Sequence, residues 1–206
     1  MYSKTWTYTP EDDNLTGFLS NATGATWTLT TTTPGDSLAH FVIITNDSAT
    51  DHSGKTVALT GTDADGRAQT ETLTLPAASV AVTSTKYWKT LTTAVPSATI
   101  GADTMDIGWT DDIIGPTIPV NWRSLHFSLT HQVDVSGTIN YDLQYTLGGV
   151  LGSTAPSTLS WLDHATTVGE TTDQSGSDTA NITAVRLAIN SLTAGATISL
   201  YLLQGN

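Results

Sequence analysis

Hydrophobic and polar residues alternate with a period of two along much of the chain. Every second residue from Ile139 to Leu147 is hydrophobic, and the residues between them are polar. Shorter stretches of the same kind occur at 125–129 and 185–189. Because successive side chains of a strand point to opposite faces, this pattern predicts half-buried β-strands. In the first half of the chain we expect strands over 27–33, 40–45, 56–62, 69–75, 87–91 and 105–109.

Turn residues separate these segments and set the expected domain boundaries. The step Asp65-Gly66 predicts a tight hairpin between 56–62 and 69–75. Gly115, Pro116 and Pro119 predict a connection without strand, because proline cannot donate to a sheet ladder. We expect an all-β protein with two β-sandwich-like domains (Ig-like or jelly-roll-like) in tandem. The expected segments are 1–20 (an N-terminal arm or first strand), 21–112 (domain 1), 113–119 (linker) and 120–206 (domain 2).

The division into two domains at 113–119 has one open alternative. Two long loops are also expected in the second half. Segment 113–119 can also be a long loop within a single sandwich. Residues 148–157 and 169–179, which are rich in Gly, Ser and Thr, are expected to be long exposed loops of the second half.

Composition agrees with the all-β interpretation and excludes some classes of partner. The chain of 206 residues contains 41 threonines, whose β-branched carbon and polar tip suit the solvated face of a strand. The net charge is −12, with seven Lys and Arg together, so binding to nucleic acid or an anionic membrane is not expected. A basic protein partner is favoured instead.

Catalytic chemistry is not predicted by any motif. There is no cysteine, which excludes thiolate catalysis, disulfides and Cys-based zinc sites. Gly-x-Ser-x-Gly, P-loop and His-Glu-x-x-His motifs are missing as well. The turn at 63–66 lacks two of the defining ligands of a calcium loop. The histidines at 40, 52, 126, 131 and 164 show no ligand spacing, and His126 is expected to face solvent. We therefore expect a non-enzyme with no catalytic residue, metal or cofactor.

The two ends of the chain are candidate interfaces. Tyr2, Trp6 and Tyr8 share one face of an extended segment, which is either an arm that docks on a neighbouring subunit or a first strand packed on its own sandwich. At the other end, Tyr201 and Leu203 make the last strand apolar on both faces. Such a strand needs two covers, so it is either an oligomer contact or a central strand beneath another domain.

A third candidate combines aromatic and polar side chains beside a predicted loop. Trp161, Asp163 and His164 could grip a sugar ring by stacking and hydrogen bonding. A tryptophan within a β-sandwich is more often a core residue.

Several segments resemble modules of structural proteins from tailed-bacteriophage virions. One group is a hairpin module at 56–75 and 86–90, and a second is formed by 137–146, 161–164 and 184–190. Among such proteins, the size and expected domain number are most similar to a head-decoration (capsid cement) protein.

This resemblance implies a non-enzymatic function, a partner and a location. A cement protein bridges coat subunits, so the implied partners are the major capsid protein and further copies of this chain, expected as a trimer. The implied location is the capsid surface of the virion, after assembly in the host cytoplasm. The first ten residues lack the apolar region of a signal peptide. The alternative function is a tail-fibre, receptor-binding or carbohydrate-binding module.

Overall fold

The computed structural model describes residues 2–120, 128–148 and 159–205, and within these ranges the regular secondary structure is β-strand. The all-β prediction is confirmed. Among the described residues, no helix is long and apolar enough to span a membrane. The strands are β1 (Tyr2–Tyr8), β2 (Asn14–Ala22), β3 (Ala39–Asn46), β4 (Thr56–Thr62), β5 (Ala68–Thr74), β6 (Ala81–Trp88), β7 (Thr90–Pro96), β8 (Met105–Ile114), β9 (Ile118–Pro119), β10 (Ser128–Ser136), β11 (Ile139–Thr146), β12 (Leu162–Asp163), β13 (Gln174–Asp178), β14 (Ala184–Leu192) and β15 (Thr197–Gly205).

The chain forms two compact units that are nested in the sequence, where tandem domains were predicted. Residues 13–111 form one unit, here called the middle unit, and residues 1–12 with 112–206 form the other, here called the terminal unit. The segment 1–20 is therefore divided, since β1 belongs to the terminal unit and β2 to the middle unit. β1 pairs antiparallel with β15 from Tyr2 opposite Gln204 to Tyr8 opposite Ile198. The N-terminal segment is thus a first strand on its own unit.

The predicted strand-free linker at 113–119 is wrong. β8 continues to Ile114 and β9 covers Ile118–Pro119, and both pair with β14. Ile113, Ile114 and Ile118 are buried, so core packing outweighs the turn signal of the neighbouring residues. Pro116 lies between the two strands, and Pro119 is the last residue of β9, opposite Ala184 of β14. Proline is tolerated at such strand ends.

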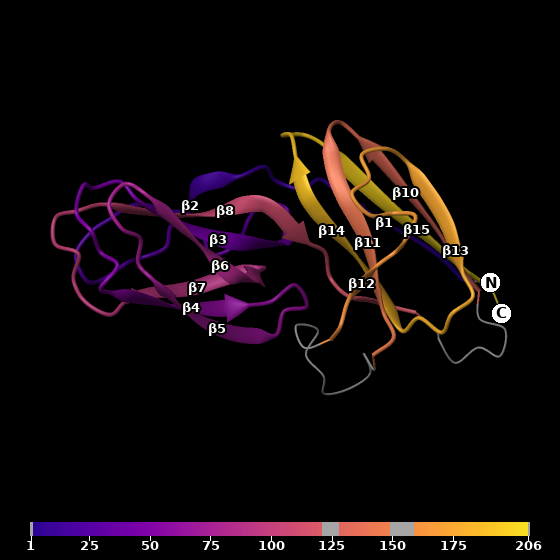
Figure 1. The fold of residues 1–206 in the computed structure, drawn as a ribbon, viewed down its shortest axis with the longest axis horizontal. Coiled ribbons are helices and arrows are strands. Elements are labelled where there is room, and N and C mark those ends of the chain that lie inside the picture. Colours follow the sequence, from indigo (N-terminus) through magenta and orange to yellow (C-terminus); the bar gives the residue numbers. More distant parts are fainter. Residues whose placement is uncertain (1, 121–127, 149–158, 206) are drawn as a thin grey trace. The chain divides into compact units, whose positions relative to one another are not determined.

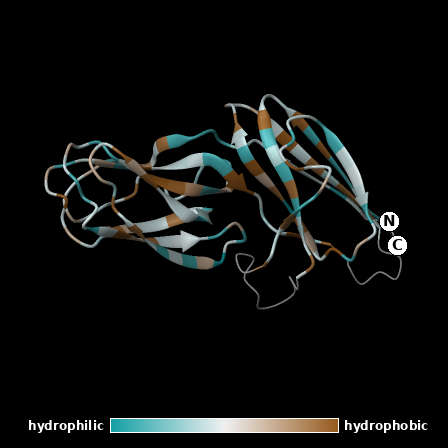
Figure 2. Ribbon diagram, in the orientation of Figure 1, coloured by the Kyte–Doolittle hydropathy of each residue, from teal (hydrophilic) through white to brown (hydrophobic). Residues whose placement is uncertain are grey.

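The terminal unit is a sandwich of two antiparallel layers (Figure 1). One layer has the strand order β1-β15-β10-β13, and the other contains β12, β11 and β14 with β9 and the end of β8. Hydrophobic and hydrophilic residues alternate along the strands (Figure 2). Their hydrophobic residues form a core that includes Leu129, Val133, Ile139, Tyr141, Leu143, Leu187, Ile198 and Leu200.

The middle unit has its own core and closes one sheet edge with side chains. Trp88, Phe18 and Trp109 are buried in this core with aliphatic residues of β3, β4 and β7. β4 pairs with β5 and β7, while the edge strand β5 is tied to β6 by polar side chains. The Gln69 amide donates to the Tyr87 carbonyl at 2.6 Å, and Glu71 Oε1 accepts from the Thr85 N–H at 2.8 Å. These bonds protect an edge that would otherwise be open for pairing.

The hairpin predicted around Asp65-Gly66 is present between β4 and β5. Asp63 Oδ1 accepts hydrogen bonds from the N–H groups of Asp65 and Arg67, at 3.0 and 2.9 Å. Gly66 has φ of 78°, the left-handed conformation that this turn requires. The aspartate thus caps its own turn.

Two local predictions are wrong because main-chain pairing does not follow hydrophobic alternation there. Residues 27–33 form no strand, although the Thr30 N–H donates to the Phe18 carbonyl at 2.8 Å and the Leu91 N–H donates to the Thr32 carbonyl at 2.8 Å. The predicted loop at 169–179 contains β13, which pairs with β10. β13 has no hydrophobic residue, so its pattern gave no strand signal. The other predicted loop, 148–157, lies almost entirely outside the described residues, as does His126.

Gly61 in β4 is required by its close approach to β7. A Cβ atom at this position would lie 2.0 Å from the Thr90 carbonyl oxygen, a main-chain atom that cannot move alone. We expect Gly61→Ala to lower the free energy of unfolding by about 2–3 kcal/mol, measured by chemical denaturation.

Gly54→Ala is the matched control, because a Cβ atom there meets nothing within 4 Å. The control should change stability by no more than about 0.5 kcal/mol. Equal effects of the two substitutions would contradict the packing described for β4 and β7.

Candidate functional site

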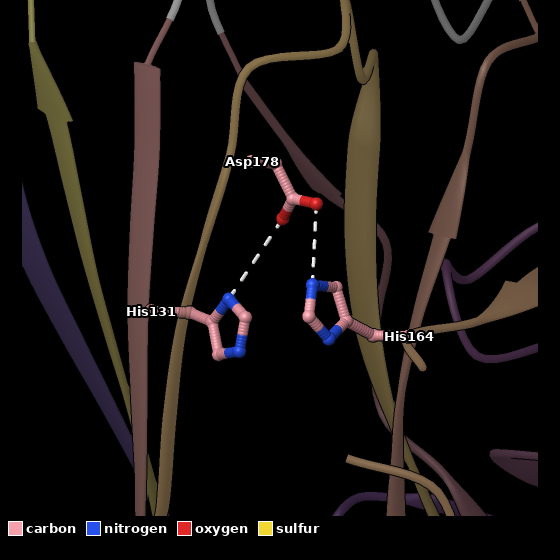
Figure 3. Close-up of side chains that lie close together, drawn as sticks. All are labelled: His131, His164 and Asp178. Carbon is pink, nitrogen blue, oxygen red and sulfur yellow. Dashed lines mark hydrogen bonds and ion pairs between the residues drawn. The ribbon is translucent and has the colours of Figure 1, made fainter. Parts of the chain in front are cut away.

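Three side chains of types that can ligate a metal meet inside the terminal unit. His131, His164 and Asp178 each offer one ligand atom, and these atoms all lie within 4.8 Å of one another. Both imidazole rings point toward the carboxylate (Figure 3). We call these three residues the His–His–Asp cluster.

His131 and Asp178 come from neighbouring strands of one layer. His131 lies on β10 directly opposite Gly176 of β13, and Asp178 is two residues further along β13. Because the side-chain period of a strand is two, Gly176 and Asp178 face the same side as His131. A Cβ atom on Gly176 would lie 2.6 Å from His131 Cε1 and 2.7 Å from Nε2. Glycine at position 176 therefore makes the space that the ring occupies.

His164 comes from the opposite layer, just after β12. The His164 N–H donates to the Leu143 carbonyl at 2.8 Å, and the Leu143 N–H donates to the Thr167 carbonyl at 2.9 Å. This pair of bonds fixes the turn 164–167 on β11. The Thr166 N–H donates to His164 Nδ1 at 3.4 Å. His164 Nε2 therefore carries the proton and donates to Asp178 Oδ1 at 3.1 Å.

His131 has an unusual electrostatic environment. Its side chain is fully buried, its Nδ1 lies 3.9 Å from Asp178 Oδ2, and neither ring nitrogen has a hydrogen-bond partner among the residues that the structure describes. The His164 ring packs edge-on against it, with 4.4 Å between centroids. Burial is the main cause that lowers the pKa of His131 to about 4; His164 lowers it further, and Asp178 opposes the shift. At neutral pH the ring is thus uncharged, with a lone pair available.

The predicted sugar-binding residues at 161–164 lie in different environments. The Trp161 ring is half-buried, and the Arg186 guanidinium carbon lies 4.2 Å from its centroid, which covers one stacking face. Asp163 is exposed and accepts a hydrogen bond from the Gln144 amide at 2.8 Å. His164 is buried and belongs to the His–His–Asp cluster. The structure does not bring these three side chains to one surface.

The predicted interface residues lie on two faces of the layer centred on β15. Trp6 and Tyr8 are half-buried and stand opposite Leu200 and Ile198, which are core residues. Burial raises the pKa of Tyr8, whose hydroxyl has no hydrogen-bond partner in the described ranges. Tyr2 also lies in β1, but its side chain is outside the described part of the structure.

Tyr201 and Leu203 point away from the core, with exposed fractions of 39 % and 38 %. Ile198, Leu200 and Leu202 of the same strand are buried. β15 is therefore apolar on both faces, as the sequence predicts, and its second face lies at the surface of the described chain. We call this surface the outer face of β15. Its use as an interface stays a prediction.

Sequence spacing gave no sign of the His–His–Asp cluster, because its members are far apart in the chain. One signal was present at His131. His131 lies two residues after Leu129, the last hydrophobic residue of the predicted strand at 125–129. Its side chain therefore points to the same face as the hydrophobic residues of that strand. Asp178 gave none, because it lies in the segment predicted as a loop.

No protein-family model, curated protein or solved structure matches the chain. The interpretation of the His–His–Asp cluster and of the outer face of β15 therefore rests on their own geometry.

The low pKa of His131 predicts how the stability of the metal-free protein depends on pH. The folded-state pKa, about 4, lies below the unfolded value of 6.5. Between these two pKa values the unfolded chain binds more protons than the folded chain. The contribution of neutral His131 to the free energy of unfolding is therefore complete above pH 6.5 and is lost as the pH falls toward 4. The expected loss is on the order of 3 kcal/mol, measured as the free energy of unfolding in the presence of a chelator.

The control is His131→Gln, which removes this titration while His164 and Asp178 remain. The wild-type curve should fall more steeply than the variant curve between pH 6.5 and 4. Parallel curves would show that His131 is not held neutral by the fold.

Proposed function

We propose that the chain is a non-enzymatic structural protein of a tailed-bacteriophage particle. In this proposal it decorates and stabilises the capsid by bridging coat subunits, as a homo-trimer. The observation that carries the proposal is the outer face of β15, where Tyr201 and Leu203 lie exposed side by side on a strand whose other face is core. The resemblance of the sequence to virion proteins supplies the identity of the partner.

The surroundings of Tyr201 and Leu203 support a protein contact. Thr5 of β1 and Gln132 of β10 flank Tyr201, and Ser3 and Thr130 flank Leu203. The flanking residues are exposed and polar, and none of these four carries a charge. An apolar centre within a polar rim is the usual anatomy of a protein–protein interface. Tyrosine is among the side chains that most often supply binding energy there.

The position of β15 determines how a partner would bind. Both edges of the strand are already paired, one with β1 and the other with β10. A partner cannot add a strand to β15 and must bind across its side chains. Such a surface is held by main-chain hydrogen bonds on both sides, so it loses little conformational entropy on binding.

The acidic charge of the chain and the repetition of its copies on a capsid both favour multivalent binding. The net charge of −12 suits a partner with basic surface. Several copies that each contact two coat subunits add stability by mass action, and linkage within a trimer raises the effective concentration of each contact. Modest affinity at a single face is then sufficient for stable decoration.

Replacement of both exposed residues tests this function. We expect Tyr201→Ser with Leu203→Thr to weaken binding to particles that lack the chain by roughly tenfold or more. The measurement is the amount of protein bound to particles of the encoding phage as a function of its concentration. Heat stability of the decorated particles should fall in parallel.

Val95→Thr is the matched control, because Val95 is exposed (55 %) on β7 of the middle unit. It removes a similar apolar surface and should leave binding unchanged. Particles without the chain that keep their heat stability and lose only attachment to host cells would contradict the proposal. That result would favour the receptor-binding alternative.

A further inference from the structure

We propose that the His–His–Asp cluster binds one divalent transition-metal ion, with Zn²⁺ as the reference case. The ligand atoms are His131 Nδ1, His164 Nε2 and a carboxylate oxygen of Asp178. The ion would join the two layers of the terminal unit, because His131 and Asp178 belong to one layer and His164 to the other (Figure 3). This inference is independent of the outer face of β15.

The distances between ligand atoms suit a single small ion. Two atoms bonded to one tetrahedral zinc at about 2.0–2.1 Å lie roughly 3.3–3.4 Å apart. His164 Nε2 lies 3.1 Å from Asp178 Oδ1, and His131 Nδ1 lies 3.9 Å from Oδ2. The three ligand atoms all lie within 4.8 Å of one another, so side-chain rotations that move them by about 1 Å would complete the geometry.

His131 supplies an independent sign of a ligand. Its ring is fully buried and directed at Asp178, and within the described part of the chain neither nitrogen has a hydrogen bond. Buried polar atoms in native proteins almost always have a partner. A metal ion at Nδ1 would give this nitrogen one. The His131 ring fits against β13 because Gly176 has no Cβ atom that would clash with it.

The surroundings of His164 suit metal binding at Nε2. Thr166 Oγ1 lies 3.0 Å from Nδ1, and a hydroxyl can either donate or accept. In the metal-free protein Nδ1 accepts. With a metal on Nε2, the proton moves to Nδ1 and is donated to Thr166 Oγ1, a common arrangement for metal-bound histidine. The long Thr166 N–H contact to Nδ1, at 3.4 Å, is lost in this state. Asp178 is partly exposed, with 19 % of its side chain accessible, so water can complete the coordination.

The donor set selects the class of metal. Two imidazole nitrogens and one carboxylate suit zinc, cobalt, nickel, copper or iron. Calcium and magnesium prefer sites made of oxygen atoms alone. The cluster should therefore discriminate strongly against these two ions.

Titration of the full, chelator-treated chain with Zn²⁺ by calorimetry tests the proposal. We expect one ion per chain and a higher melting temperature, and no response to Mg²⁺. Asp178→Asn and His131→Gln should each weaken binding by at least roughly 100-fold, since even indirect partners of metal ligands account for about 10–100-fold.

His52→Gln is the matched control. His52 is a buried histidine whose Nε2 lies 3.1 Å from Asp103, as in the His164–Asp178 pair, but no second histidine joins it in the described chain. This variant should bind Zn²⁺ like the wild type. Zn²⁺ binding that is absent from the wild type, or that survives loss of both His131 and Asp178, would overturn the proposal.

A measurement on the wild type alone covers the case in which the variants fail to fold. Nitrogen-15 NMR of the histidine rings should show two rings perturbed by Zn²⁺, one at Nδ1 and the other at Nε2. No ring shift, or shifts confined to other histidines, would also overturn the assignment.

Discussion

The pairing of β15 with β1 on one side and β10 on the other is the constraint on which the terminal unit depends. It joins the first and last strands of the chain and fixes the phase of every side chain on β15. Ile198, Leu200 and Leu202 consequently enter the core, and Tyr201 and Leu203 face outward. If the pairing register of β15 shifted by one residue, the side chains that now face the core would face outward and those that face outward would enter the core. Polar residues of β15 such as Ser199 would then be buried. The same register places His131 of β10 in phase with the core.

The sequence contains most of the information for the strands but little for their partners. Alternation at 139–147 predicts β11 correctly, because Ile139, Tyr141 and Leu143 are buried in one core, although Tyr145 is half-buried and Leu147 lies exposed beyond the strand. β13 is not predictable in this way, because none of its residues is hydrophobic and no alternation can appear. Its main-chain hydrogen bonds to β10 hold it in the sheet. The linker prediction failed for the opposite reason. Proline and glycine signals were present, but buried isoleucines on both sides continued the pairing.

The candidate sites differ in predictability for the same physical reason. The outer face of β15 is a property of one strand, so a local pattern shows it. The His–His–Asp cluster depends on contact between two layers and on the pairing of β10 with β13, which no local pattern contains. The opposite case is the segment 161–164. Trp161, Asp163 and His164 are close in sequence, yet their side chains lie in three different environments. Long-range strand pairing thus decides which polar residues meet.

If the outer face of β15 is the contact surface, the interior and the surface of the terminal unit have different roles. Its interior is held by apolar packing and the His–His–Asp cluster, and its surface presents Tyr201 and Leu203 within a polar rim. The most direct measurement is a side-chain-resolution map of particles that carry the protein. The account predicts that both residues contact a coat subunit or a second copy of the chain. A map in which the outer face of β15 meets only solvent in every copy would contradict it.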